Sequence, residues 1–179
     1  MISMGVTMLN SRLAEIRQQA NPPFTGASAG YGDFFVAKTK NAFGVDASSK
    51  IDGIELAMKT ILEETERARR FGFTETEYDR ARANYLQRVE SAYNEREKMK
   101  NDTYVNEYIS NFLDNEPMPG IEYEYAMMNQ LAPNIPVAAI NQVMQQLITD
   151  NNQVVLLAGP EKEGVKYPTK EEIAALLKQ

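Results

Sequence analysis

The side chains best suited to chemistry in this chain are the carboxylates of an acidic cluster between residues 63 and 79. Carboxylates can bind metal ions or act as general bases, and Glu75 and Asp79, four residues apart, would share one face of a helix. Arginines are interleaved with these acids, as is typical of a solvated helix face with weak surface ion pairs. We therefore interpret the cluster as helix surface. Its acids are Glu63, Glu64, Glu66, Glu75, Glu77 and Asp79, and the arginines are Arg67, Arg69, Arg70, Arg80 and Arg82.

The residue types that are missing exclude whole classes of mechanism. The 179 residues contain no histidine and no cysteine. Histidine general bases, Ser–His–Asp triads, thiol nucleophiles and disulfides are therefore excluded. Zinc is bound mostly by His and Cys, so we predict no catalytic residue, no metal ligand and no cofactor in this chain. A third hypothesis is an enzyme that uses only carboxylates and tyrosines, but no arrangement of these residues in the sequence suggests an active site.

The charge, the apolar runs and the glycine-rich stretch of the chain exclude several kinds of partner. The net charge of −6 argues against a nucleic-acid footprint, which needs a basic face. No run approaches the roughly 20 apolar residues of a membrane span. The glycine-rich stretch GASAGYGD does not open a helix after a strand, as a phosphate-binding loop must. We therefore expect no nucleic acid, no membrane span and no nucleotide.

The elements that must position any site begin with a helix over residues 4–20, which Pro22 and Pro23 end. A strand over residues 24–31 follows. In it Gly26, Ser28 and Gly30 fall on one face by period two and leave that face almost bare. Such a strand suits close approach by another backbone, a helix or a peptide.

A second strand over 34–46 should pair antiparallel with the first, with the turn at residues 30–33. The apolar run Val154–Ala158 predicts a third strand that is buried on both sides. Helices dominate the remaining chain, so we predict an α+β fold that is helix-rich, with an antiparallel sheet and helices packed on one face. The helices are expected over residues 50–70, 75–115 with a break near residues 100–102, 121–131, 137–148 and 170–178.

Several local signals mark the ends of these helices. Ser49, three residues before Asp52, resembles a cap, and Gly72 follows the second helix as a C′ glycine would. Capping boxes are expected from Thr74 with Glu77 and from Thr169 with Glu172.

The segment between Tyr104 and Met128 is rich in aromatic residues and methionine. Core packing is the usual role of such residues, and an adaptable binding surface is the second interpretation.

The order of these pieces resembles a known family. LNSRLAEIR before the prolines, then FFVAKTKNAFGVDASSKIDGIELAMKTILEETERARRFGFTETEYDRARANYLQ and NNQVVLLAGP, are similar to a domain of pitrilysin/insulinase-type zinc metallopeptidases. The resemblance implies a larger antiparallel sheet, whose opening strands and helix would lie upstream. Residues 1–160 would then be the C-terminal part of a non-catalytic domain, and residues 161–179 a linker and short helix.

The resemblance also implies a substrate contact. A family domain that faces the catalytic one supplies an arginine and, seven positions later, a tyrosine that hold the substrate backbone. Arg17 matches the arginine, but the seventh residue after it is Phe24, which lacks the hydroxyl. We favour a surface role for Arg17, or an ion pair with a nearby carboxylate, and a core role for Phe24. The family's H-x-x-E-H zinc motif is absent.

The leading hypothesis is therefore a non-catalytic scaffold and substrate-chamber domain of a zinc peptidase. It would present the strand with Gly26, Ser28 and Gly30 near bound peptide, and zinc is expected in the catalytic domain of the parent enzyme. Other domains of that enzyme and peptide substrate would be the partners. An exposed sheet edge would be open to self-association, and the resemblance implies a periplasmic location. The alternative is a stand-alone helical interaction module built on the helix at 75–115, although its apolar stripe keeps no strict heptad.

Overall fold

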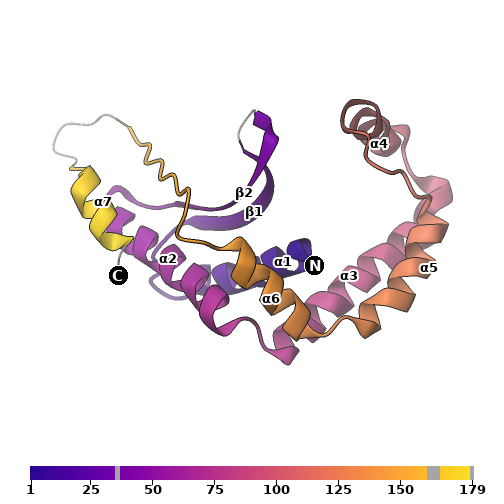
Figure 1. Ribbon diagram of the computed structural model, residues 1–179, viewed down its shortest axis with the longest axis horizontal. Helices are drawn as coiled ribbons and strands as arrows, with labels where there is room; N and C mark the ends of the chain where they lie inside the picture. The colour runs from indigo at the N-terminus through magenta and orange to yellow at the C-terminus, as the bar shows by residue number, and fades with distance from the viewer. Residues whose placement is uncertain (35–36, 161–165, 178–179) are drawn as a thin grey trace. The chain divides into compact units, whose positions relative to one another are not determined.

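A computed structural model describes residues 1–34, 37–160 and 166–177 and shows a helix-rich chain (Figure 1). The described residues form seven α-helices and one two-stranded antiparallel sheet, so the predicted α+β class is confirmed. The elements are α1 (Ile2–Arg17), β1 (Gly26–Phe34), β2 (Ala37–Ser48), α2 (Ile54–Phe71), α3 (Glu75–Glu95), α4 (Asn101–Asp114), α5 (Ile121–Leu131), α6 (Val137–Leu147) and α7 (Lys170–Leu176).

These elements fall into two compact units. Unit 1 combines Met1–Glu75 with Val137–Gln179, and unit 2 is Thr76–Pro136. Each unit is described by itself below. No helix among the described residues is long and apolar enough to cross a membrane.

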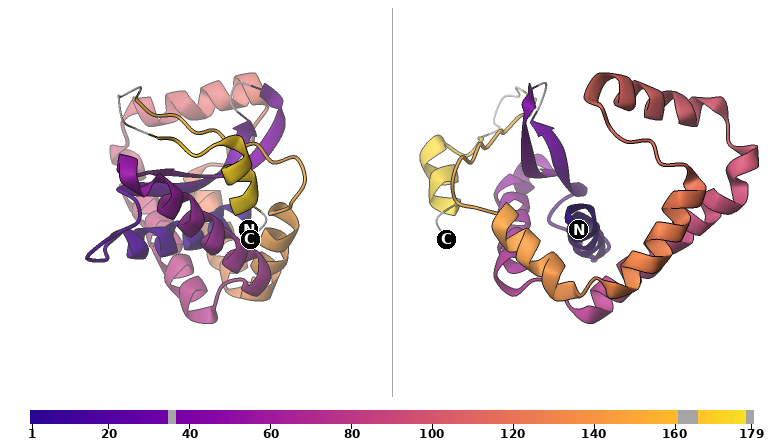
Figure 2. Two further views of the ribbon diagram at one scale, coloured as in Figure 1. Left: turned by 90° about the vertical axis from the view of Figure 1, so that its left-hand side faces the viewer. Right: turned by 45° about the vertical axis from the view of Figure 1, so that its right-hand side comes forward.

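The predicted hairpin is present in unit 1. β1 and β2 pair from Gly26↔Ser48 to Asp33↔Asn41, with a register shift before Phe34↔Ala37. The predicted turn was placed too early, because pairing continues past Gly30 and Gly32 and keeps both within β1. Helices α1 and α2 pack against the hairpin, α1 mainly on β1 and α2 on β2 (Figures 1 and 2).

The core of unit 1 lies between the sheet, α1, α2 and α6. Helix α1 crosses α6 closely at Gly5, because a Cβ at that position would collide with the side chain of Met144. Phe24 is 1% exposed, which confirms its predicted core role. The other fully or nearly buried apolar side chains of the unit include Met8, Leu9, Leu13, Ala57, Ala68, Phe73, Ile140 and Met144.

Unit 2 shows the predicted break in the long helix. A 3₁₀ turn over Arg96–Lys98 separates α3 from α4, and α4 begins after Lys100. The Tyr78 hydroxyl lies 2.8 Å from the Ile135 carbonyl oxygen and 3.2 Å from the Ala132 carbonyl oxygen, to which it donates. This contact ties α3 to the turn after α5. The continuous helix of the interaction-module hypothesis is therefore interrupted.

The predicted third strand is wrong. Residues Val154–Leu157 are 38 to 74% exposed and form no strand with the described residues. An apolar run predicts burial only if the fold supplies a neighbouring strand, and neither β1 nor β2 pairs with this one. The run ends at Gly159, against the ring of Tyr167, whose hydroxyl donates to the Pro160 carbonyl oxygen at 2.7 Å.

Of the predicted helix caps, the one at Ser49 is wrong and the one at Thr169 is confirmed. Ser49 does not cap α2: its hydroxyl donates to the Lys50 carbonyl oxygen, and a 3₁₀ turn over Ile51–Gly53 precedes the helix. The capping box of Thr169 and Glu172 is confirmed, with both reciprocal hydrogen bonds present. Of the predicted linker at residues 161–166, residues 161–165 lie outside the described residues.

Candidate functional site

The candidate site is the bare face of β1. A Cβ added at Gly26 or Gly30 would meet no atom within 4 Å, and Gly44, which lies opposite Gly30 on β2, is equally open. Ser28 lies between the two β1 glycines, and its hydroxyl donates to the Asp46 carboxylate on β2 at 2.8 Å. The structure therefore brings Gly26, Ser28 and Gly30 together on one accessible surface, as the period of two predicted.

The outer edge of β1 is closed by a side chain that the sequence reasoning missed. The amide nitrogen of Asn10 donates to the Ala29 carbonyl oxygen at 3.0 Å, and the Ala29 N–H donates to the Asn10 side-chain oxygen at 2.7 Å. Asn10 thus pairs with β1 as a neighbouring strand would. The signal in the sequence was a polar residue inside the apolar stripe, next to the buried Leu9.

This pairing also defines the outer edge of β2. Ala29 lies opposite Val45, and its backbone groups point away from β2 because they bond Asn10. Residues opposite each other in an antiparallel pair share the same bonding state, so the backbone N–H and C=O of Val45 point away from β1. A peptide strand could add to the sheet along β2, whereas Asn10 blocks the same mode at Ala29.

An apolar groove lies at the same end of β1. It has a volume of about 820 Å³ and lies between the start of α1, β1 and α6. Gly30 contributes to its lining beside Tyr31, whose side chain lies on the face of β1 opposite the bare face. Its lining includes Ile2, Val6, Gly30, Tyr31 and Val143.

The corner after α2 is also held by an asparagine side chain that pairs with the backbone, as Asn10 does at Ala29. Gly72 has a φ of 68°, a left-handed conformation that favours glycine. The Asn141 side chain accepts from the Phe73 N–H at 2.8 Å and donates to the Phe73 carbonyl oxygen at 3.0 Å. Arg12 donates to the Gly72 carbonyl oxygen at 2.9 Å and lies 4.5 Å above the Phe73 ring. The first arginine of the LNSRLAEIR segment is therefore structural.

The arginine and phenylalanine of the implied substrate contact are not on the bare face. Arg17 is exposed at the last position of α1, whereas Phe24 is buried in the core. A buried phenylalanine ring without a hydroxyl offers no group to a peptide backbone. The sequence interpretation, Arg17 on the surface and Phe24 in the core, agrees with both placements.

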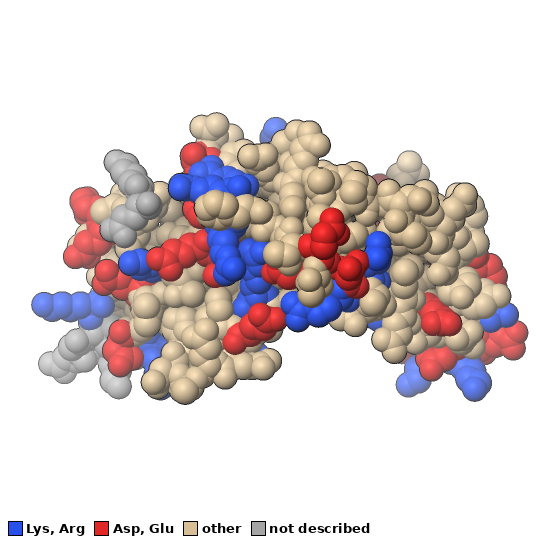
Figure 3. All heavy atoms as spheres, turned by 90° about the horizontal axis from the view of Figure 1, so that it is seen from below, with Lys and Arg blue, Asp and Glu red and all other residues tan. Residues whose placement is uncertain are grey.

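The part of the acidic cluster on α2 forms ion pairs. Arg69 and Arg70 both contact Glu66, at 2.8 and 2.7 Å, and Arg67 contacts Glu64 at 3.3 Å. Figure 3 shows Lys or Arg beside Asp or Glu side chains on the face it presents. Arg69 also bonds Asp150, and this hydrogen bond raises the pKa of the Arg69 guanidinium. These carboxylates are engaged with arginines as on a solvated helix face.

The chain's residues do not fit a zinc ion. The sequence lacks both His and Cys, and the described residues contain no group of three or more acidic side chains placed to hold a metal. Burial raises the pKa of the Tyr85 phenol, but Tyr85 lies on α3 in unit 2, whereas the bare face belongs to unit 1. The candidate site considered below is therefore the bare face of β1.

Half of the side chains in the aromatic and methionine-rich segment are exposed. Tyr125 stacks on Tyr93 with ring centroids 4.5 Å apart, but Tyr108, Phe112 and Tyr123 are exposed. The first interpretation, core packing, is wrong for these residues, because none of the described residues covers the side of α4 or α5 on which they lie.

The fold with this glycine-faced hairpin is that of part of an insulinase-type protease. The chain is 30% identical over 153 residues to the zinc protease PQQL-like of Arabidopsis thaliana, across 86% of this chain and 13% of that protein. The crystal structure of the periplasmic protease PqqL from Escherichia coli matches 98% of the chain, with a TM-score of 0.79 and 22% identity.

A predicted insulinase family protease from Yersinia pestis also matches 98% of the chain, with a TM-score of 0.77 and 12% identity. No protein-family model matches. The chain spans only 19% of the E. coli protein and 37% of the Y. pestis chain. The resemblance to part of a pitrilysin/insulinase-type peptidase is therefore confirmed.

Proposed function

We propose that this chain is a non-catalytic scaffold segment of a larger insulinase-type zinc peptidase. The observation that carries the proposal is a protease-like fold over 98% of a chain whose sequence lacks both His and Cys. Zinc and the groups that activate water would belong to a catalytic domain elsewhere in the parent enzyme. That domain and the other domains of the parent would be the partners of this chain.

The bare face of β1 would line the path of bound peptide. Gly26 and Gly30 carry no side chain and have open space above them, so a peptide backbone could approach closely. The apolar groove next to Gly30 would take an apolar peptide side chain. The free edge of β2 could instead pair with a second copy of the chain or with another domain. Because PqqL is periplasmic, we also propose an exported parent enzyme.

The scaffold role is tested by activity. The purified chain is incubated with zinc and an unstructured peptide, and the products are analysed by mass spectrometry. We expect no cleavage above that of a zinc-only control. Cleavage that increases with bound zinc would refute the non-catalytic assignment.

The peptide-lining role has its own test. The backbone amide signals of Gly26, Gly30 and Gly44 are followed by NMR while an extended apolar peptide is added at millimolar concentration. Gly30→Val should weaken the response, since its side chain would occupy the space above the sheet. Gly120→Val serves as the matched control, because Gly120 lies in unit 2 at an extended backbone position. Equal loss in both variants, or no response at the glycines, would exclude this role.

A further inference from the structure

The two edges of the hairpin differ in their backbone hydrogen bonds. On β1 the side chain of Asn10 occupies both backbone groups of Ala29. On β2 the N–H and C=O groups of Phe43 and Val45, which lie opposite Tyr31 and Ala29, point away from β1. Within the described residues, no backbone group from outside the hairpin bonds them.

The outer edge of β2 lacks the features that keep a sheet edge unpaired. Proteins protect such edges with lysine, proline, a bulge or a covering side chain. From Asn41 to Ser48 the strand contains neither Lys nor Pro, and its register shift lies beyond Asn41, toward the turn. The carboxylate of Asp46 lies on the bare face with Ser28 and not on the edge. About 27 Å of unprotected edge favours pairing with another strand.

A second segment of unit 1 also lacks a strand neighbour. Val154 and Leu156 are 70 and 74% exposed, whereas Val155 and Leu157 are 43 and 38% exposed. This alternation is that of a strand with one face partly covered. The sheet of unit 1 therefore has room for more strands than the two that pair among the described residues.

We propose that the outer edge of β2 accepts an extended strand from a part of the parent enzyme outside this chain, an inference that rests on the proposed function. The chain spans 19% of the E. coli protein that it resembles, so most strands of such a parent lie elsewhere in it. A strand is the partner whose N–H and C=O groups alternate with the spacing of this edge.

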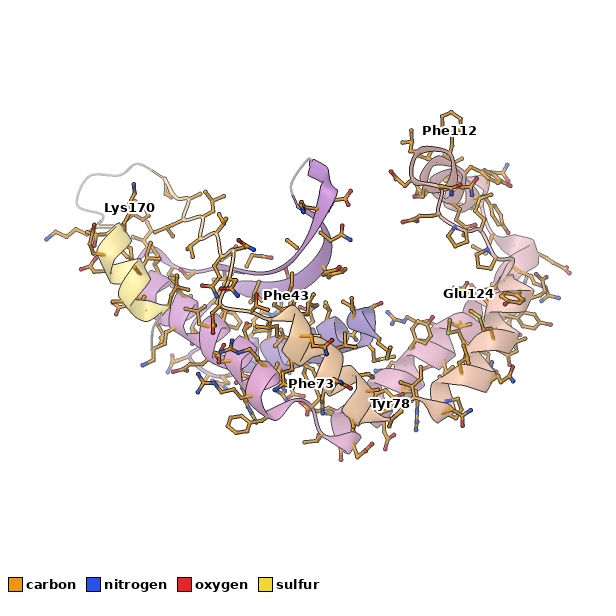
Figure 4. All side chains as sticks on the ribbon, viewed as in Figure 1. Phe43, Phe73, Tyr78, Phe112, Glu124 and Lys170 are labelled. Atoms are coloured by element: carbon orange, nitrogen blue, oxygen red, sulfur yellow. The ribbon has the colours of Figure 1, made fainter. Side chains whose placement is uncertain are left out.

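The two faces of the sheet specify the side chains of that strand. Phe43 lies on the face that α1 and α2 cover (Figure 4), where Ala29 is buried, so the residues opposite Phe43 and Val45 should be apolar. The residue opposite Asp46 would lie on the exposed bare face, where Lys or Arg would form a cross-strand ion pair. Within the described chain, Asp46 accepts from the Ser28 hydroxyl and forms no ion pair.

The test uses the full chain and a synthetic peptide of about eight residues, the length of the unprotected edge. Valine and threonine alternate in this peptide, and lysine replaces one threonine. We expect it to slow hydrogen exchange at the backbone amides of Phe43 and Val45, which NMR follows residue by residue. A peptide with two adjacent central prolines should not protect these amides, because each of its edges then lacks an N–H.

Two variants of the chain locate the binding edge. Val45→Pro removes an outward N–H and no hydrogen bond to β1, so it should abolish peptide binding while the hairpin stays paired. Asp46→Asn should weaken binding of the lysine peptide several-fold in low salt, because it removes the cross-strand ion pair. Asp52→Asn is the matched control and should leave binding unchanged, since Asp52 is an exposed carboxylate of unit 1 outside the sheet.

Three outcomes would overturn the proposal. Equal weakening by Asp46→Asn and Asp52→Asn would show non-specific attraction. Protection of Phe43 and Val45 without peptide, together with a dimer in sedimentation, would make a second copy the occupant. A response of the bare-face glycines without protection of the β2 amides would place the peptide on the face and leave the peptide-lining role intact. The zinc cleavage assay tests the peptidase role separately, so a failure of that role is distinguishable from a failure of strand addition.

Discussion

Two asparagine side chains replace backbone partners in unit 1. Asn10 pairs with both backbone groups of Ala29, and Asn141 does the same for Phe73. A carboxamide offers one donor and one acceptor side by side, as a peptide group of a neighbouring strand does. These pairs fix the β1 edge relative to α1 and the corner after α2 relative to α6.

Asn10→Ala should lower the free energy of unfolding by about 1–3 kcal/mol, because it leaves a part-buried N–H and C=O of Ala29 unsatisfied. Urea unfolding followed by circular dichroism measures the change, and hydrogen exchange at the Ala29 amide should accelerate. Asn84→Ala, at an exposed position of α3, is the control and should be neutral or slightly stabilising, since alanine favours helix. Equal destabilisation by both would contradict the pairing.

Gly72→Ala should destabilise unit 1 by about 1–3 kcal/mol. The φ of 68° disfavours alanine, and its Cβ would collide with the Asn141 side chain. Thermal unfolding measures the effect. Gly44→Ala, in the open part of β2, should change stability little, and a similar loss there would show that any glycine replacement is harmful.

At the scale of elements, the crossing of α1 and α6 depends on a missing side chain. Gly5→Val should destabilise by about 1–3 kcal/mol through overpacking against Met144, which is fully buried. Met144→Ala should cost less in the Gly5→Val background than in the native chain, because it removes the atoms that collide with the valine. A double-mutant cycle measures the coupling, and strictly additive effects would contradict the contact.

Element type was largely predictable from local pattern. The prolines after α1, the period of two in β1 and the capping box of Thr169 each act over a few residues, so the sequence contains the whole cause. The bare face of β1 followed from the same period. The extent of the hairpin was not predictable, because pairing past Gly32 depends on both strands at once.

Long-range features escaped sequence reasoning for a physical reason. Asn10 and Asn141 meet their partners 19 and 68 positions away, and no local pattern announces such bonds. The predictions of a strand at Val154–Ala158 and of core packing around Phe112 were wrong for the same reason. Both predictions took apolar character as burial, which requires a neighbour that the described chain does not supply.

At the scale of the whole molecule, the absence of His and Cys makes a clear prediction about zinc. Zinc at 100 times the dissociation constant of a native-state site would add about 2.7 kcal/mol of stability, and a shift of a few degrees in Tm would follow. We expect micromolar zinc or a chelator to leave the Tm of this chain unchanged in thermal scans. A rise with zinc that a chelator reverses would show a site after all.

The solvent-facing run from Val154 to Leu157 should make the chain prone to aggregate. Short segments with strong β preference, without charge or proline, are the sequences that stack into fibrils. Nothing described in this chain shields the run, so concentrated solutions should slowly form aggregates that bind thioflavin. Val155→Lys would place a charge within the run, and this variant should aggregate more slowly.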